Sequence, residues 1–394
     1  MPRACRRATE RMAHTGPTPD TRGIMQLPPF RLERFFAQYE FTSPYPICLS
    51  DCESVTIGDL LALEPAADAG LRDLWLGYTE SPGGPGLRAA VAALYTTIAA
   101  EHVLMHSGAE EAIFNFMHAL VQPGDHVIVH WPGYQSLAEV ARSIGADVSL
   151  WTVRPEDGWQ LNLDDLRRIL RPDTRAVVVN LPHNPTGFLP DAAFVHDLAA
   201  LADRHGFLLF GDEVYRGLEQ DPAARLPALC DMTPQALSLG VMSKTYGLAG
   251  LRIGWIATRN REIFAAMAQM KDYTTICNSA PSEYLAELAL RHAGTLVARN
   301  LAIIQQNLGE LDAFFAAHAE QLTWVRPTAG PIAFPAFRHL DADAVARRLV
   351  DETGVLILPG AQIDPSYGRH FRLGFGRKSL ADGLARFGPF LQTI

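Results

Sequence analysis

Long apolar runs and an excess of positive charge are both missing from this sequence. No apolar stretch approaches the roughly 20 residues that a helix needs to cross a bilayer. The formal net charge of −9 at pH 7 argues against nucleic acid or an anionic membrane as the main partner. We therefore predict a protein with no membrane and no nucleic-acid partner.

Cysteine is scarce as well. The five cysteines are dispersed and odd in number, which is typical of a protein from the reducing cytoplasm. Cys48 and Cys52 have the spacing of half a metal site, but no second Cys/His pair completes it, so no metal is expected. A chain of 394 residues with 48% hydrophobic content predicts one large and one smaller domain.

The first 25 residues differ from the rest. Arginines are scattered there among Thr, Pro and Gly, without the apolar segment of a secretory signal. We expect a disordered leader, or a start codon assigned too early with Met25 as the true start. An arginine-rich transit peptide is a further alternative, although Glu10 and Asp20 interrupt it.

Lysine is the rarest charged residue, with only Lys244, Lys271 and Lys378 in the whole chain. Lys244 lies in a glycine-rich, largely uncharged stretch and is followed eight positions later by Arg252. A lysine in such a pocket can lose its proton and form a Schiff base with a carbonyl. An arginine fork suits a phosphate. Pyridoxal 5'-phosphate (PLP), an aldehyde that carries a phosphate, matches both groups. The alternative for an isolated Ser-Lys pair is a surface lysine.

The stretch from Ser243 to Gly254 resembles the signature of the class I and II aminotransferases, PLP enzymes of fold type I. The resemblance implies that Lys244 is the catalytic lysine and that Ser243 and Arg252 contact the cofactor. One position departs from the pattern: Val241 stands where the family usually has serine or threonine. A hydroxyl contact to the phosphate must therefore be replaced elsewhere.

A second segment with the same implication follows the predicted strand Val103–His106. The turn and helix start at Ser107-Gly108-Ala109-Glu110 present free backbone N–H groups and the positive end of a helix dipole to an anion. The segment resembles the family's phosphate site. Gly108, Ala109 and Glu110 would then donate mainly through the backbone, so the Glu110 side chain need not face the phosphate.

Two tyrosines match aromatic positions of the family. Tyr78 precedes Gly86-Leu87-Arg88, which leads into a predicted alanine-rich helix, Ala89–Ala100. In relatives this tyrosine reaches the cofactor phosphate of the partner subunit, which implies a homodimer. The alternative for Tyr78 is a core or surface aromatic residue. Tyr134 follows the predicted strand His126–His130, where relatives stack an aromatic ring on the pyridine.

Polar residues follow the next predicted strands. Asn184 lies in Asn-Pro-Thr-Gly, a fingerprint of the family, and should hydrogen-bond the cofactor's phenolic oxygen together with Tyr215. Asp212 ends a buried strand, where α/β folds place ligands, and would pair with the pyridine nitrogen. In the family an arginine binds the α-carboxylate of the substrate, and Arg372 is the matching position. The resemblance implies that Asn184 helps Arg372 to orient this carboxylate. A surface arginine is the alternative for Arg372.

Departures from the family pattern indicate the substrate. Relatives have an apolar-glycine run where this chain has Ser50-Asp51-Cys52-Glu53-Ser54. Asp51 and Glu53 would suit a cationic side chain, guanidinium best of all, unless the loop is simply solvated. With Tyr39-Glu40-Phe41 and Gln362-Ile363-Asp364, the loop resembles the capreomycidine synthase branch. That branch uses PLP to eliminate the hydroxyl of a hydroxylated arginine and to close the guanidinium onto the β-carbon.

Alternating strands and helices predict an α/β fold of fold type I: a large domain with a mainly parallel, seven-stranded sheet and a small α/β domain. The predicted division is a leader 1–25, an N-terminal segment 26–70 joining the small domain, a large PLP-binding domain 71–285 and a C-terminal small domain 286–394. We predict a PLP enzyme, transaminase or lyase, acting on a small-molecule amino acid. Cyclisation of 3-hydroxyarginine in antibiotic biosynthesis is the first hypothesis and ordinary transamination the second. A non-enzymatic PLP-binding regulator is the third, although no DNA-binding pattern precedes Pro28.

Overall fold

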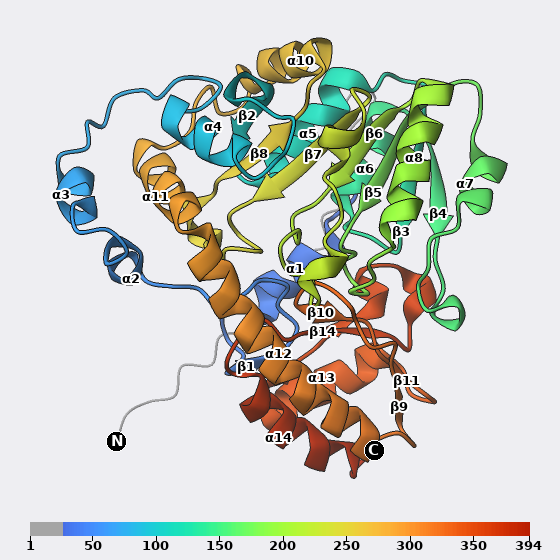
Figure 1. Cartoon of the computed structure of the whole chain (residues 1–394). Coiled ribbons are helices and arrows are strands. Elements are labelled where there is room, and N and C mark those ends of the chain that lie inside the picture. Colours follow the sequence, from blue (N-terminus) through green and yellow to red (C-terminus); the bar gives the residue numbers. More distant parts are fainter. Residues whose placement is uncertain (1–26) are drawn as a thin grey trace, which may run out of the picture.

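A seven-stranded sheet forms the centre of the computed structural model, which describes residues 27–394 (Figure 1). The predicted leader, residues 1–25, lies outside the described residues. The strand order is β2-β8-β7-β6-β5-β3-β4, and only β8 runs antiparallel to its neighbours. Its strands are β2 (Val103–His106), β3 (His126–Trp131), β4 (Asp147–Thr152), β5 (Thr174–Asn180), β6 (Leu208–Asp212), β7 (Ala236–Val241) and β8 (Gly254–Ala257).

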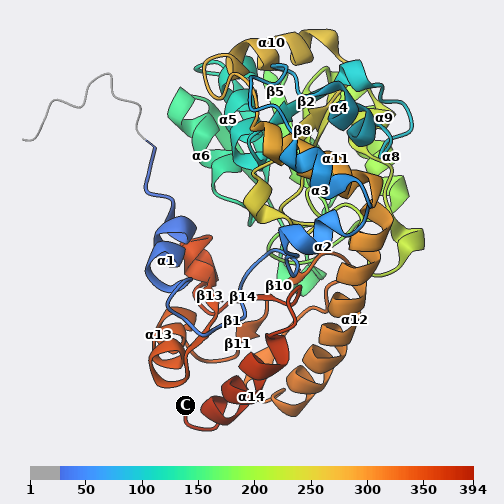
Figure 2. The ribbon, with the colours of Figure 1, turned by 90° about the vertical axis from the view of Figure 1, so that its left-hand side faces the viewer.

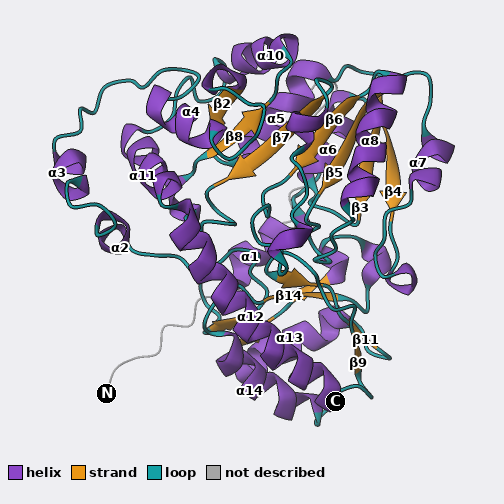
Figure 3. Cartoon of the chain, in the orientation of Figure 1, coloured by secondary structure: helices purple, strands orange, loops and turns teal. Residues whose placement is uncertain are grey.

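Helices cover both faces of this sheet (Figure 3). The inner strands are apolar without interruption because successive side chains point to opposite faces and both faces are buried. Ala176 and Val178 of β5 pack in one cluster with Phe116 of α5, whereas Val177 packs in another with Leu198 of α8. The helices that surround the sheet are α4 (Pro85–Ala92), α5 (Ala109–Leu120), α6 (Ser136–Ile144), α7 (Leu163–Ile169), α8 (Ala192–His205), α9 (Leu229–Met232), α10 (Arg261–Lys271) and α11 (Ala280–Arg291).

Short strands and three helices form a second, smaller α/β part. The long helix α12 (Ala293–Ala317) extends along it, and α13 (Ala342–Thr353) and α14 (Leu380–Leu391) complete its helices (Figure 2). Its strands are β1 (Tyr45–Pro46), β9 (Leu322–Thr323), β10 (Ile332–Ala333), β11 (Ala336–Phe337), β12 (Val355–Leu356), β13 (Leu358–Pro359) and β14 (Phe371–Gly374). Because β1 pairs with β12, the segment after residue 26 is joined to the C-terminal strands. The residue limits of the two domains stay a prediction.

Helix α1 (Arg31–Tyr39) is amphipathic, with charged residues on one side and apolar residues on the other. Its buried residues Leu32 and Phe36 pack in one cluster with Leu356 and Ile363 of the small part. The remaining short helices are α2 (Ile57–Leu61), α3 (Ala67–Arg72) and the 3-10 turns Ala100–His102, Pro155–Asp157, Pro222–Ala224, Ala249–Leu251, Gly360–Gln362 and Pro365–Tyr367. Among residues 27–394, none of the helices combines the length and apolarity that crossing a membrane requires.

The predicted helix Ala89–Ala100 is wrong in both limits, since α4 covers Pro85–Ala92. Further along the predicted range, the backbone N–H groups of Thr96 and Thr97 donate to the Asp231 carboxylate and not to helix carbonyls. β-branched residues at these positions also lower helix propensity. The alanine-rich composition therefore overestimated the length of the helix.

Candidate active site

A cavity of about 350 Å³ opens at the carboxyl ends of β5, β6 and β7. Its wall also includes α1, the first turn of α5, the loop at Ser50 and the β14 residue Arg372. The sheet and the small α/β part thus contribute to one site. The carboxyl edge of a mainly parallel sheet is the place where α/β folds bind ligands.

Lys244 enters the cavity from the loop that follows β7. Its Nζ donates a hydrogen bond to Ser50 Oγ at 2.8 Å. Burial lowers the pKa of Lys244, while the Asp51 and Asp212 carboxylates oppose that shift and Arg372 adds to it. A lysine with a lowered pKa spends more time as the neutral amine that attacks carbonyls and accepts protons.

Asp212 is the last residue of β6 and is only 6% exposed. Burial raises the pKa of its carboxyl to about 7, against the opposing effects of the Val214 N–H and Lys244. Tyr215 also lines the cavity, and its hydroxyl donates to the Ser50 carbonyl at 2.9 Å. The buried carboxylate of Asp212 is suited to holding a protonated ring nitrogen, because a neighbouring cation would favour the ionised form of this carboxylate.

One end of the cavity is built for an anion. Gly108 precedes α5 with φ +87°, and a Cβ on it would lie 2.5 Å from Arg252 Nη2. The Arg252 guanidinium therefore lies directly over the helix N-terminus, and its Nη1 donates to Ser243 Oγ at 3.5 Å. Ala109, in the first turn of α5, lines the same end. Helix N–H groups and an arginine fork together favour a phosphate.

Glu110 differs from the expectation of a backbone role alone. Its side chain lines the cavity, and Ser136 Oγ donates to its Oε2 at 3.1 Å. Burial raises the pKa of this carboxyl to about 7, although the Ser136 hydrogen bond opposes the shift. A carboxyl group that holds its proton near neutral pH can donate a hydrogen bond, which an ionised one cannot.

Arg372 and Asn184 meet at another part of the wall. Arg372 is 2% exposed, and its Nε donates to the Cys48 carbonyl at 3.1 Å. Its Nη1 donates to Asn184 Oδ1 at 3.3 Å. These contacts fix a planar guanidinium fork at the cavity, the geometry that binds a carboxylate with two hydrogen bonds.

The two predicted aromatic residues lie in different places. Tyr134 lines the cavity, and its hydroxyl donates to Glu33 Oε1 at 3.1 Å. Burial raises the pKa of Tyr134 well above its usual value. Tyr78, in contrast, is 87% exposed and does not line this cavity.

Asp51 and Glu53 do not act as the pair that the sequence suggested. Asp51 lines the cavity but accepts both prongs of Arg377, at 3.0 Å from Nε and 2.7 Å from Nη2. The Glu53 carboxylate accepts the backbone N–H of Lys378 at 2.9 Å and does not line the cavity. The structure therefore corrects the placement of Glu53, because a local backbone contact holds its side chain.

Sequence reasoning did not assign two carboxylates of the cavity wall to the site: Glu33, and Glu40, which it used only within the Tyr39-Glu40-Phe41 segment. Both belong to the helix and C-cap of α1, whose residues Leu32, Phe36 and Glu40 recur at every fourth position on one face. That period was visible in the sequence. The surface that this face would meet was not.

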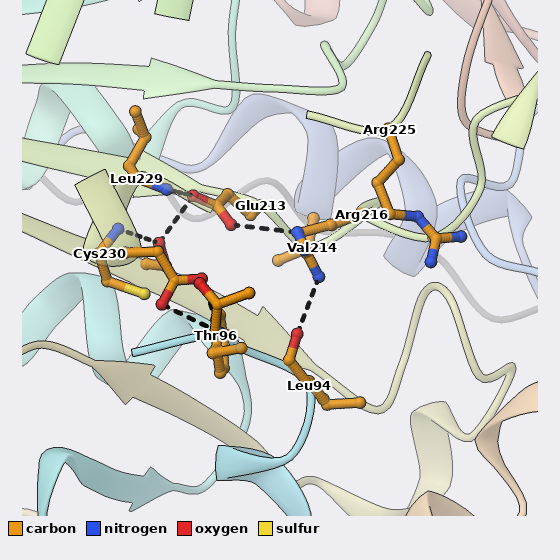
Figure 4. Close-up of polar contacts among 12 residues, drawn as sticks. Leu94, Thr96, Glu213, Val214, Arg216, Arg225, Leu229 and Cys230 are labelled. Atoms are coloured by element: carbon orange, nitrogen blue, oxygen red, sulfur yellow. Dashed lines mark hydrogen bonds and ion pairs between the residues drawn. The ribbon is translucent and has the colours of Figure 1, made fainter. Parts of the chain in front are cut away.

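Glu213, next to Asp212, does not line the cavity. Its polar contacts are drawn in Figure 4. Its Oε1 accepts hydrogen bonds from the Leu229 N–H at 2.8 Å and from Ser238 Oγ at 2.7 Å. Arg216 Nε lies 3.9 Å from the other oxygen. Glu213 therefore ties β6 to β7 and α9.

Cys48 and Cys52 are both free and buried, and burial raises the pKa of each thiol to about 12. Thiols of this kind are protonated at neutral pH and poor metal ligands. Within residues 27–394, no group of three or more His, Cys, Asp or Glu side chains is arranged to hold a metal ion.

Comparison with known proteins gives three informative similarities and one family match. Residues 59–383 match the family described as "Aminotransferase class I and II". Capreomycidine synthase of Streptomyces vinaceus is 34% identical over 94% of this chain and 96% of its own length. Arginine–pyruvate transaminase AruH of Pseudomonas aeruginosa is 29% identical over 79% and 81%. The solved PLP-dependent cyclase OrfR superposes with a TM-score of 0.83 and 30% identity, covering 93% of this chain and 98% of that one.

The residues of the cavity fit PLP. The turn at Gly108 has no room for a side chain beneath Arg252, as expected of a cradle for a phosphate. Asp212 is a buried carboxylate that a ring N–H⁺ would satisfy, and Lys244 is a buried amine within the same cavity. Gly108, Ala109, Ser243 and Arg252 would hold the phosphate and Asp212 the ring nitrogen, with Lys244 available for the covalent bond.

Proposed function

The chain belongs to the class I and II aminotransferase family and is therefore an enzyme with PLP as its cofactor, and we propose a specific reaction for it. The proposed reaction is the cyclisation of a hydroxylated arginine. The predicted fold type I architecture is confirmed by this membership and by the seven-stranded sheet. The observation that carries the proposal is the similarity to capreomycidine synthase along nearly the whole of both chains. The product would serve antibiotic biosynthesis.

Bound PLP supplies an electron sink for the electrons released when a bond to the α-carbon of an amino acid breaks. The chain's own residues would do the rest. Arg372, assisted by Asn184, would bind the α-carboxylate. Lys244, with its lowered pKa, would remove the α-proton as a general base. Asp212 would keep a positive charge on the ring nitrogen.

The proposed reaction is balanced without an oxidant. The α-proton and the β-hydroxyl group leave as one molecule of water, which creates a double bond between the α- and β-carbons. A guanidine nitrogen then bonds to the β-carbon and loses its proton, while the α-carbon regains one. The product therefore differs from 3-hydroxyarginine by the loss of one water.

Ordinary transamination is the second candidate. The similarity to arginine–pyruvate transaminase supports it, since the same lysine, aspartate and arginine would serve either reaction. In that case the amino group of an amino acid would pass to a 2-oxo acid, and no water would be lost. Both candidates take a small-molecule amino acid as substrate.

We also propose a cytoplasmic homodimer. Tyr78 is 87% exposed. Four other large apolar side chains are exposed by more than half: Trp75 and Leu76 in the same segment, and Tyr273 and Ile276 in a second one. A hydrogen bond from Thr79 Oγ1 to the Asn278 carbonyl joins the two segments. A second copy of the chain would cover such a surface. The four cysteines among residues 27–394 are free, which suits a reducing compartment. Light scattering of the purified protein tests the dimer; a monomer at micromolar concentration contradicts it.

Mass analysis of the product tests the proposed reaction. The PLP-loaded enzyme is incubated with 3-hydroxyarginine, with and without pyruvate. A product lighter than the substrate by one water, formed without pyruvate, supports cyclisation. Formation of alanine from pyruvate, with no dehydrated product, supports transamination instead.

A further inference from the structure

Helix α1 and its C-cap present two carboxylates to the cavity. Glu33 and Glu40 both line it, together with Leu32 and Phe36 of the same helix. Seven residues separate the two acids, which corresponds to about 10 Å along a helix axis. Positions seven apart lie on nearly the same side of a helix, so both acids face the cavity from one side of α1.

Each positively charged residue of the cavity wall already has an assigned role. Lys244 and Arg252 would serve the cofactor, and Arg372 the substrate carboxylate. Among the acids, Asp212 would pair with the ring nitrogen and Asp51 is occupied by Arg377. Glu110 lies at the phosphate end, in the first turn of α5. Two carboxylates of the cavity wall then remain without a cation from residues 27–394, and they belong to α1 and its C-cap.

The contacts of Glu33 and Glu40 agree with this assignment of the charged residues. Glu33 accepts one hydrogen bond, from the neutral hydroxyl of Tyr134. The Glu40 carboxylate has no hydrogen-bond donor or ion-pair partner among residues 27–394. Its pKa is raised, first by burial, while Arg377 opposes the shift and Asp51 adds to it. A half-buried carboxylate in this position is stabilised by any cation that enters the cavity.

The Asp51–Arg377 pair shows what kind of cation this wall accommodates. Arg377 places a planar guanidinium on a carboxylate with two parallel hydrogen bonds at the rim of the same cavity. Because Arg377 already holds Asp51, a substrate guanidinium cannot use that carboxylate without displacing it. The neighbouring Glu40 offers the same chemistry, and none of residues 27–394 forms an ion pair with it.

We propose that Glu33 and Glu40 are the specificity-determining residues for the substrate side chain, and that they select amino acids with a guanidinium or similar delocalised cation. This inference rests on the proposed function, because it assumes that the α-carboxylate binds at Arg372. It reassigns to α1 a role that the sequence suggested for Asp51 and Glu53. A neutral side chain of the same length would leave the half-buried Glu40 carboxylate without a cation, which is unfavourable, and would give no attraction to the more exposed Glu33.

Paired ligands test this selectivity. Arginine and citrulline have the same length and shape, but citrulline carries a neutral urea group in place of the guanidinium. Their dissociation constants are measured on the PLP-loaded enzyme from the change in the cofactor's visible absorbance. The variants are E33Q, E40Q and the double variant, which keep side-chain size and remove only charge. The exposed Glu310→Gln on α12 is the matched control.

The expected result is a wild-type preference for arginine that falls at least about tenfold in the double variant, with arginine weakened and citrulline unchanged. The control keeps the wild-type preference. If the double variant binds cofactor normally and still prefers arginine as wild type does, the inference is wrong while the proposed function stands. If the preference falls as expected but no dehydrated product forms from 3-hydroxyarginine, the proposed reaction is wrong while the selectivity of α1 stands.

Discussion

Lys244 Nζ donates to Ser50 Oγ at 2.8 Å, and this contact joins two loops 194 positions apart in the chain. The carbonyl of the same serine accepts the hydroxyl of Tyr215 at 2.9 Å. The Tyr215 hydroxyl thereby holds the Ser50 backbone in place, and the Ser50 side chain in turn positions the Lys244 amine. A general base whose proton-accepting nitrogen is oriented in this way reaches its transition state without reorganisation.

Ser50→Ala should slow turnover on the order of tenfold, because the amine loses the acceptor that orients it. The hydroxyl also favours the protonated amine, so its loss should move the acidic limb of the pH–rate profile to lower pH. Steady-state rates across a pH series measure both effects. Ser54→Ala, an exposed serine of the same loop, is the control. An unchanged pH profile in Ser50→Ala would contradict a positioning role.

Lys244→Ala should abolish the visible absorbance of covalently bound cofactor and lower the rate at least about 10³-fold. The exposed Lys378→Ala should change neither. Visible spectra of the two purified variants measure the bound cofactor, and a substrate-consumption assay measures the rate. A Lys244→Ala enzyme that retains the absorbance band and a comparable rate would show that another amine carries the cofactor.

Arg372→Lys should raise KM for the amino acid by about two orders of magnitude while the cofactor stays bound, since a lysine cannot reproduce the planar fork. Arg369→Lys, an exposed arginine three positions earlier, serves as the control. The measurement is KM and kcat for both variants, with the cofactor spectrum as a check on the fold. A normal KM in Arg372→Lys would place the α-carboxylate elsewhere.

The raised pKa of Asp212 predicts how the free energy of unfolding of the cofactor-free protein depends on pH. Burial raises the pKa of this carboxyl from 3.8 to about 7, so the folded state binds the proton more tightly than the unfolded chain does. Asp212 therefore destabilises the fold progressively as pH rises from about 4 to about 7. Relative to wild type, Asp212→Asn should gain on the order of 1 kcal/mol or more over this range, since a tenfold change in proton affinity corresponds to about 1.4 kcal/mol.

Urea unfolding of wild type and Asp212→Asn at a series of pH values measures that difference. The variant's advantage should grow with pH and level off above about pH 7. An advantage that shrinks as pH rises would mean that Asp212 is held ionised in the fold, against the effect of its burial.

Short motifs explain why so much of the candidate site could be placed from the sequence. Asn184 and Asp212 each lie at the end of a predicted strand, and Lys244 follows β7 in the structure. The carboxyl ends of neighbouring parallel strands meet at one edge. The structure brings all three to one cavity, as the sequence implied. Their chemical roles stay predictions.

Contacts between distant segments explain what the sequence could not place. Glu33 and Glu40 line the cavity only because α1 docks on strands more than 300 positions later in the chain. Asp51 meets Arg377 across 326 positions, so no local pattern predicts that it is already paired. Likewise, Thr97 lies inside the range predicted as helix, but its backbone N–H donates to the remote Asp231.

The most direct test of the central claim is the number of 3-hydroxyarginine molecules that each enzyme molecule consumes when no 2-oxo acid is present. Cyclisation regenerates the cofactor in its starting form, so we predict many turnovers per enzyme and a cofactor absorbance band that returns once the substrate is exhausted. Transamination without an acceptor stops after one amino group has moved to each cofactor. Consumption of a single equivalent, with permanent loss of the band until pyruvate is added, would contradict the account.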